Sequence, residues 1–467
     1  MKKISLVVIV LTVLAGCVVG PKYQQPVVDV PVQFRDSQYS KATDTIFYLN
    51  WWDMFQDTVL QGLIREAVQN NRNIRTTLAR VEESRLSLGF TRTASLPSIG
   101  YGAKAGYYDL SNGNNNEIGG GLPRASYNLF AQASWEPDFW GKYKNQKLAA
   151  EAEMHATEDD YRYMYISLVA ETAMQYFLLR DLDERMLIAE QTIKSRESSL
   201  GIIKARFEKG EVAEMDKLQA EGQLAIARAT YYNLQRNIRT TENALSVLTG
   251  KQPGEIRRGY FNHEQKVPPE LPVGLPSTLL SQRPDVRAAE NMIQAQVARI
   301  GIAEAVRYPT FDLMALFGVH SQDISQLFST NALATVLTAG ITGPIFQFGR
   351  NKKRVEIEKK RSEQFVLQYE QAILNASKEV QDGLIGIETY KKERENLEIL
   401  VATTKKTQEL SWARYEAGYS SYLELLDAER MQFDAANNAS IIRREQLISL
   451  VKLYKALGGG WDKNLNF

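Results

Sequence analysis

Arg206-Phe-Glu-Lys-Gly210 has a close copy further along the chain, Arg414-Tyr-Glu-Ala-Gly418, at an offset of 208 residues (414 − 206 = 208). The segments after each glycine also correspond, because Glu221 recurs as Glu429 at the same offset (429 − 221 = 208). A gapless repeat of this kind indicates an internal duplication. The alternative, two unrelated helix–turn–helix connections, is disfavoured because other parts of the two halves also match.

Long helical patterns lie before and after both copies, so Gly210 and Gly418 each stand between two helices. A glycine in this position is typical of a helix end that needs a positive φ angle. We therefore expect two long helical hairpins that turn at these two glycines.

The N-terminus has the pattern of a secretory signal. Two lysines precede an apolar stretch from Ile4 to Leu14, and Leu14-Ala-Gly-Cys17 follows at once. Because this ending resembles a bacterial lipobox, we expect residues 1–16 to be removed and Cys17 to carry diacylglycerol and an N-acyl chain. A plain signal peptide with a chance cysteine is the alternative. Val18 after the cysteine, in place of an aspartate, favours the outer membrane over the inner one.

Composition and motifs argue against several functional classes. The formal net charge is +1 and Cys17 is the single cysteine, so neither nucleic-acid binding nor an internal disulfide is indicated. The histidines, His155, His263 and His320, are not in a metal-binding spacing. Gly119-Gly-Gly121 lacks the Lys and Ser/Thr of a phosphate-binding loop. Since no nucleophile–base set is present, we predict a protein that is not an enzyme and holds no metal or cofactor beyond the lipid.

Each half contains two segments in which apolar residues occupy every second position. They span about 98–109 and 126–137 in the first half, and about 310–320 and 334–345 in the second. This alternation predicts strands, and a length of about ten residues with an aromatic at one end also fits membrane strands. A soluble hairpin is the alternative. No run of about 18 apolar residues follows Cys17, so any membrane crossing is expected to be made by strands.

Heptad repeats mark the long helices. From Tyr161 to Phe207, and again from Phe365 to Gln408, seam positions follow one another at alternating steps of four and three residues. This spacing predicts coiled-coil packing. A helix from Gly141 to Phe207 could reach on the order of 100 Å, too long for a compact globular enzyme. The predicted fold class is mainly α with a small β part, in which the long hairpins form an α-barrel and the plan occurs twice.

The expected order of segments follows from these patterns. They are a signal peptide (1–16), a lipidated extended lead (17–50), a first repeat (51–250), a linker (251–278), a second repeat (279–460) and a C-terminal tail (461–467).

Four strands per chain are too few to close a membrane barrel, since known barrels begin at about eight strands. An open strand edge in lipid would leave backbone groups unpaired. Two copies would give an eight-stranded barrel, which its own side chains fill. Three copies are the smallest assembly expected to leave a pore.

Several motifs, in this order, resemble the outer-membrane factor lipoproteins of tripartite efflux systems, the TolC-like channels of the OprM/NodT branch. The matching stretches are Cys17-Val-Val-Gly-Pro-Lys-Tyr-Gln-Gln-Pro26, Trp51-Trp-Asp-Met-Phe55, Leu280-Ser-Gln-Arg-Pro-Asp-Val-Arg-Ala-Ala-Glu290 and the two Arg…Gly turns. The resemblance implies a homotrimer with a twelve-stranded barrel in outer-membrane lipid and a long periplasmic α-barrel. It also implies export of drugs or other small solutes together with a periplasmic adaptor and an inner-membrane pump.

The resemblance further implies a periplasmic gate just past the second turn. The family's Tyr-Leu-x-x-x-Asp pattern is present as Tyr422-Leu-Glu-Leu-Leu-Asp427, which makes Leu423 and Asp427 the candidate gate residues. They are four residues apart and therefore share a helix face. The alternatives are a seam residue for Leu423 and a solvated surface acid for Asp427. Glu424 departs from the neutral residue expected beside the gate.

By the same resemblance, Arg414 and Tyr415 match positions that hold the tip closed through hydrogen bonds to a neighbouring hairpin. Asp216, in the first hairpin, is the candidate acceptor. Two other functions remain open from the sequence. One is the same kind of conduit serving type I protein secretion, and the other is a structural coiled-coil lipoprotein without a pore.

Overall fold

The computed structural model describes residues 18–28, 52, 55–108, 124–266 and 283–459. The expected signal peptide, Cys17 with its expected lipid, and the expected C-terminal tail lie outside these residues.

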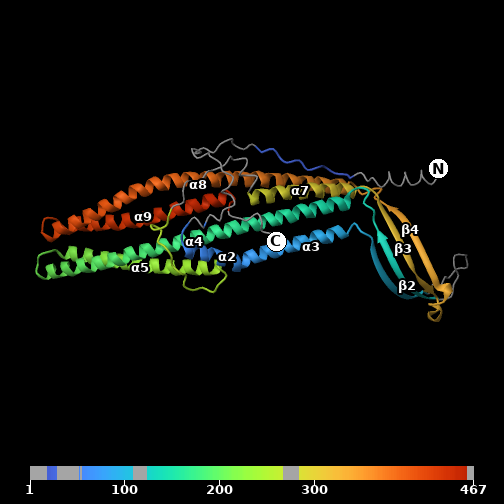
Figure 1. Cartoon of the computed structure of the whole chain (residues 1–467), viewed down its shortest axis with the longest axis horizontal. Helices are drawn as coiled ribbons and strands as arrows, with labels where there is room; N and C mark the ends of the chain where they lie inside the picture. Colours follow the sequence, from blue (N-terminus) through green and yellow to red (C-terminus); the bar gives the residue numbers. More distant parts are fainter. Residues whose placement is uncertain (1–17, 29–51, 53–54, 109–123, 267–282, 460–467) are drawn as a thin grey trace. The chain divides into compact units, whose positions relative to one another are not determined.

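One antiparallel sheet contains β1 (Ser98–Tyr108), β2 (Arg124–Trp135), β3 (Thr310–Ser321) and β4 (Leu333–Thr342), in the order β1-β2-β3-β4 (Figure 1). Strands β2 and β3 pair in antiparallel register although the whole first helical hairpin separates them in sequence. Two short 3-10 turns, η3 (Ile324–Gln326) and η4 (Thr330–Ala332), connect β3 to β4. The four predicted strands are therefore present and form a single sheet.

Two strands end earlier than the sequence pattern predicts. β2 ends at Trp135 instead of 137, and β4 ends at Thr342 instead of 345. Pro137 and Pro344 lie just beyond these ends. Because proline has no N–H to donate to a neighbouring strand, it stops the ladder of hydrogen bonds.

A long helical hairpin follows each strand pair. The first consists of α4 (Lys142–Glu208) and α5 (Glu214–Leu248), and the second of α8 (Arg350–Glu416) and α9 (Tyr422–Ala456) (Figure 1). Both long helices have 67 residues and both return helices have 35. The helix starts differ by the same offset as the turn motifs (350 − 142 = 208). The duplication predicted from the sequence is thus confirmed in the helices.

Shorter helices precede the strand pairs: α2 (Thr58–Asn70) and α3 (Arg72–Thr93) in the first half, and α7 (Pro284–Ala305) in the second. No helix among the described residues is both long and apolar enough to cross a membrane.

The chain groups into two compact units, and each draws on both repeats. The strand unit comprises the described residues within 1–27, 80–157 and 288–369. The hairpin unit comprises those within 28–79, 158–287 and 370–467. The repeat boundaries predicted from the sequence do not coincide with the boundaries of these compact units. They stay a prediction of where the two duplicated halves begin and end.

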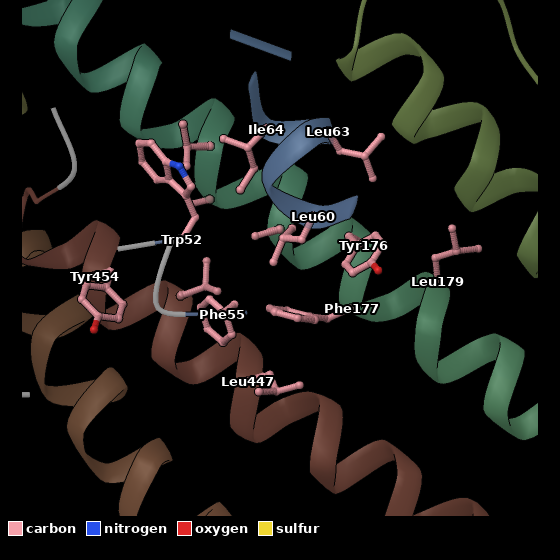
Figure 2. Packing of buried hydrophobic residues seen from close by; sticks show 14 of the residues in the cluster. Trp52, Phe55, Leu60, Leu63, Ile64, Tyr176, Phe177, Leu179, Leu447 and Tyr454 are labelled. Carbon is pink, nitrogen blue, oxygen red and sulfur yellow. The ribbon is translucent and has the colours of Figure 1, made fainter. Parts of the chain in front are cut away.

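The hydrophobic core of the hairpin unit lies where α2 packs against α4 and α9. Phe55, Leu60 and Phe177 are fully buried, and Figure 2 shows the rings of Phe55 and Phe177 beside each other, with centroids 5.2 Å apart. Leu447 from α9 belongs to the same cluster. Burying each such side chain contributes about 1.5–3 kcal/mol, so this cluster anchors the bases of both hairpins.

Asp57 is buried and connects the start of α2 to the segment after the first hairpin. Its Oδ1 accepts hydrogen bonds from the backbone N–H groups of Val59 (2.9 Å) and Leu60 (3.2 Å), which makes it the helix N-cap. Its Oδ2 accepts from Tyr176 Oη (2.7 Å) and Gln265 Nε2 (2.7 Å). These bonds fix the core at the end of the hairpins away from the two turns.

Candidate gate at the helical turns

Both hairpin turns are closed by a glycine with positive φ, 74° at Gly210 and 78° at Gly418. In the first turn the Glu211 N–H donates to the Arg206 carbonyl at 2.9 Å, and the equivalent bond in the second turn measures 2.8 Å. This is the Schellman arrangement, in which glycine avoids the cost of a left-handed conformation. The two turn glycines singled out by the sequence therefore occupy the positions that require them.

The first turn of α9 has one buried and one exposed face. Leu425 and Leu426 are buried and pack into a cluster that also contains Leu200 from α4. Leu423 and the side chain of Asp427 are each 53% exposed. Within the chain, the two candidate gate residues thus share the face that the hairpin packing leaves uncovered.

Ion pairs on this exposed face stay within the second hairpin. Asp427 Oδ1 lies 3.8 Å from Arg430 Nη1, and Arg414 Nε lies 3.3 Å from Glu424 Oε1. Exposed pairs of this kind contribute about 0–1 kcal/mol each. The acid at position 424, which departs from the family pattern, is therefore the partner of Arg414 in the single chain.

Tyr415 packs into the same apolar cluster and is 5% exposed. Burial raises the pKa of its hydroxyl, the Arg206 charge opposes the rise, and the charge of Asp216 adds to it. The buried hydroxyl has no hydrogen-bond partner among the described residues. Among the described residues, Asp216 makes no hydrogen bond to Tyr415 or Arg414. A buried hydroxyl left unpaired costs about 1–3 kcal/mol.

Arg206 forms hydrogen bonds that connect the first hairpin to the second. It was not among the site residues predicted from the sequence. Its Nη2 donates to the Glu416 carbonyl at 3.1 Å and its Nη1 to the Tyr415 carbonyl at 3.4 Å. The guanidinium lies 5.1 Å from the centre of the Tyr415 ring. These carbonyls belong to the last turn of α8, where acceptors lack helical partners and positive charge is favoured. The sequence could have indicated this role, because Arg206 occupies the position in the first repeat that Arg414 occupies in the second.

A buried polar layer lies deeper between the hairpins, and the sequence analysis also missed it. Arg196 Nη1 donates to the Gln223 carbonyl at 2.6 Å, and Ser199 Oγ donates to Glu429 Oε1 at 3.4 Å. Burial lowers the pKa of Arg196 and raises the pKa of Glu429. The second carboxylate oxygen of Glu429 has no hydrogen-bond partner in the described residues. In the sequence, this buried polar layer could have been inferred from Arg196, a charged residue at a heptad seam position.

The described part of the lead begins beside the junction of β2 and α4. The Val19 N–H donates to the Trp140 carbonyl at 3.1 Å, and Asn145 Nδ2 donates to the Val19 carbonyl at 3.2 Å. Cys17 itself lies outside the described residues. Among those residues, no group of three or more His, Cys, Asp or Glu side chains could hold a metal ion.

Comparison with known proteins identifies the family. The sequence matches the family described as outer membrane efflux protein over residues 63–251 and 275–459. It is 31% identical over 452 residues to the cation efflux system protein CusC of Escherichia coli K12, covering 96% of this chain and 97% of that protein. It is 30% identical over 453 residues to the probable outer membrane lipoprotein SilC of Salmonella typhimurium, with 96% and 97% covered.

A solved structure shares the fold. The open state of the outer membrane channel MtrE of Neisseria gonorrhoeae superimposes with a TM-score of 0.85 at 29% sequence identity, covering 97% of this chain and 100% of that one. The family match, the relatives and the fold agree with the architecture built above. The chain therefore belongs to the outer membrane efflux protein family, and it is an outer-membrane efflux channel, not an enzyme.

Proposed function

We propose that three copies of this chain form the exit duct of a tripartite efflux pump. A periplasmic adaptor and an inner-membrane pump would deliver drugs or other small solutes to it. The observation that carries this proposal is the sheet order β1-β2-β3-β4, which leaves β1 and β4 as edges in the single chain. Edges in lipid must be paired, and pairing β4 of one copy with β1 of the next supplies the missing hydrogen bonds.

The lipid anchor would hold the assembly at the membrane surface. The Val19 N–H donates a hydrogen bond to the Trp140 carbonyl at the junction of β2 and α4. Cys17 lies two residues earlier in the sequence, so a diacylglycerol and N-acyl group on it would start near the end of a membrane strand. Acyl chains there can enter the lipid without stretching the lead, which supports Cys17 as the site of lipidation.

The proposed gate consists of Leu423 and Asp427. Both project from the face of α9 that hairpin packing leaves exposed. In a trimer each residue would form a ring of three, the leucines resisting wetting and the aspartates favouring cations. The energy for transport would come from the inner-membrane pump.

The duplication suggests how the proposed latch works. Arg206 caps the final carbonyls of α8 within the chain. Arg414 is its duplicate, so in the closed trimer it would leave Glu424 and cap the end of α4 in the neighbouring copy. Tyr415, whose hydroxyl has no hydrogen-bond partner among the described residues, and Asp216, whose charge acts on it, would complete the latch.

Two measurements test this proposal together. Chemical cross-linking of the detergent-extracted protein should yield species up to a trimer and no larger. The same preparation in planar bilayers should produce discrete single-channel currents. A trimer that never conducts would leave the structural lipoprotein as the better explanation, and a conducting monomer would contradict the argument from strand edges.

A further inference from the structure

The sheet has one apolar face and one face that carries polar side chains. The apolar face presents large exposed side chains on all four strands, among them Tyr101, Leu129, Phe317 and Leu337. The opposite face, the lumen face, consists of the even-numbered residues within 98–107, 125–135, 310–321 and 333–342. Membrane strands turn apolar residues toward lipid and polar ones inward, so in the proposed duct this second face lines the lumen. The inference below therefore rests on the proposed function.

Three polar residues of the lumen face are direct neighbours across three strands. Lys104 of β1 is opposite Asn128 of β2, and Asn128 is opposite His320 of β3. Asn128 Oδ1 lies 2.8 Å from His320 Nδ1, which must donate because an amide oxygen can only accept. Asn128 Nδ2 donates to Ser126 Oγ at 3.0 Å. The amide is therefore engaged by other side chains, and this row offers Lys104 no carboxylate.

An aromatic ring beside Lys104 takes the place of an acidic partner. Lys104 Nζ lies 5.7 Å from the centre of the Phe130 ring, within the range of a cation–π contact. The ring fills the space above Gly102, where an added Cβ would lie 2.7 Å from Phe130 Cζ. On the other side, an added Cβ at Gly318 would lie 2.7 Å from Phe130 Cβ. The two glycines thus make room for a ring that positions the lysine without neutralising it.

The four strands supply no carboxylate near Lys104. β1, β2 and β4 contain no acidic residue, and Asp312 is the single acid of β3. Asp312 is eight residues from His320 (320 − 312 = 8), which corresponds to about 26 Å along a strand. Asp323 lies beyond the end of β3, where its carboxylate caps the turn η3. Among the described residues, Lys104 makes no ion pair.

The next copy in the proposed trimer also leaves this charge uncompensated. β1 is an edge strand, so Lys104 would lie beside β4 of the neighbouring copy. From Ile324 to Gly349, a segment that includes β4 and the residues on both sides of it, no residue is charged. No register between the two edges therefore brings a carboxylate of that strand against Lys104. Threefold symmetry places the three lysines at one level of the lumen.

Lys104 lies in the half of β1 away from the helices. α3 ends five residues before β1 begins (98 − 93 = 5), whereas the far end of β1, at Tyr108, leads away from it. His320, in the same row, is the last but one residue of β3. In the proposed duct this half of the sheet is the one nearer the exterior.

We propose that Lys104 forms a ring of positive charge near the outer mouth of the barrel, which concentrates anions and the anionic groups of exported solutes. Rings of lysine or arginine favour anions in pores, and a lumen lined by one sign of charge raises the local concentration of the opposite ion. The proposed gate residue Asp427 favours cations, so the two rings would select on opposite charges.

Reversal potentials in planar bilayers under a potassium chloride gradient test the proposal. The parent channel carries Leu423→Ala and Asp427→Ala, so that the candidate gate acids do not contribute to ion selectivity. Adding Lys104→Gln should lower the ratio of chloride to potassium permeability about two- to threefold near 0.01 M salt, where charges act over about 30 Å. The difference should vanish near 1 M salt, where they act over about 3 Å.

Two further variants of the same parent are controls. Lys104→Arg keeps the charge and should keep the permeability ratio of the parent. Lys22→Gln removes an exposed cation from the lead, which contacts Asn145 of α4 and Gly301 of α7, and should leave the ratio unchanged.

Equal permeability ratios for the parent and Lys104→Gln in dilute salt would overturn the proposal. A difference that persists in 1 M salt would also overturn it, because it would indicate a change in the shape of the pore and not in its charge. A parent assembly that carries no current would contradict the proposed duct itself, and the lysine ring with it.

Discussion

Glu429 shows how a single residue can make the contact between the hairpins sensitive to pH. Burial raises the pKa of its carboxyl, while the charge of Arg196 and the hydroxyl of Ser199 oppose the rise. The nearby Tyr422 hydroxyl has its pKa raised to about 12, mainly by burial and then by the Glu429 charge. Arg430 and Asp434 act on this layer from the same helix as Glu429.

The sign of the effect follows from proton linkage. A raised pKa means that the folded protein binds this proton more readily than the unfolded chain does. The resulting stability is fully present below the unfolded value of about 4.3 and is lost as pH rises through the folded pKa. Glu429→Gln should therefore remove part of the fall in melting temperature between about pH 4.3 and neutrality.

The duplication supplies a matched control for this prediction. Glu221 is equivalent to Glu429 and forms a partly exposed pair with Lys204 at 3.0 Å. Glu221→Gln should leave the pH profile of the melting temperature close to that of the wild type. Parallel profiles for wild type and Glu429→Gln would show that the buried carboxyl does not control stability.

At this scale the sequence predicted some site residues and missed others. Leu423 and Asp427 were proposed as a gate from the family's local motif and a spacing of four residues, and this role stays a prediction. Arg206 and Glu429 make their contacts with the other hairpin, so no local pattern reveals their roles. Arg206 could have been inferred from its duplicate Arg414, and Glu429 was visible only as a repeated acid.

Among the elements, the hairpin turns have the clearest local requirement. A Cβ added at Gly418 would meet no atom within 4 Å, but φ there is 78°. Gly418→Ala should therefore cost about 1–2 kcal/mol through backbone strain alone. Gly222, in α5, also has nothing within 4 Å of an added Cβ and has no positive φ. Gly222→Ala should stabilise the protein by about 0.5–1 kcal/mol.

Melting temperatures of the two glycine variants in detergent measure these changes. The expected result is opposite signs, with Gly418→Ala lower and Gly222→Ala higher than the wild type. Equal shifts in the same direction would contradict the role assigned to the left-handed turn.

Most elements could be predicted because their causes are local. Heptad spacing marked the long helices, alternation marked the strands, and glycine marked the turns. The ends of β2 and β4 were missed by two and three residues (137 − 135 = 2 and 345 − 342 = 3). The prolines just beyond them decide those ends, because they cannot take part in the ladder.

For the whole molecule, the sequence predicted the duplication but not how the repeats share their packing. Each compact unit contains segments from both halves, and β2 pairs with β3 across the repeat boundary. Such pairing depends on contacts between residues far apart in sequence. The channel identity came from several motifs spread along the chain together with the strand count, and the family match confirmed it.

In the proposed trimer, Leu423 and Asp427 form the gate of the pore. Three clustered carboxylates would repel one another and attract cations, while the leucine ring would resist wetting. Each latch bond is expected to contribute about 1–3 kcal/mol, so the closed tip could be opened by an adaptor that offers competing contacts.

Single-channel recording in planar bilayers of the variant carrying both Leu423→Ala and Asp427→Ala shows whether these residues restrict the pore. If they form the gate, the variant should have higher conductance and weaker cation preference than the wild type, in an assembly that cross-linking shows to be trimeric. Wild-type conductance and ion selectivity in that correctly assembled variant would contradict this role.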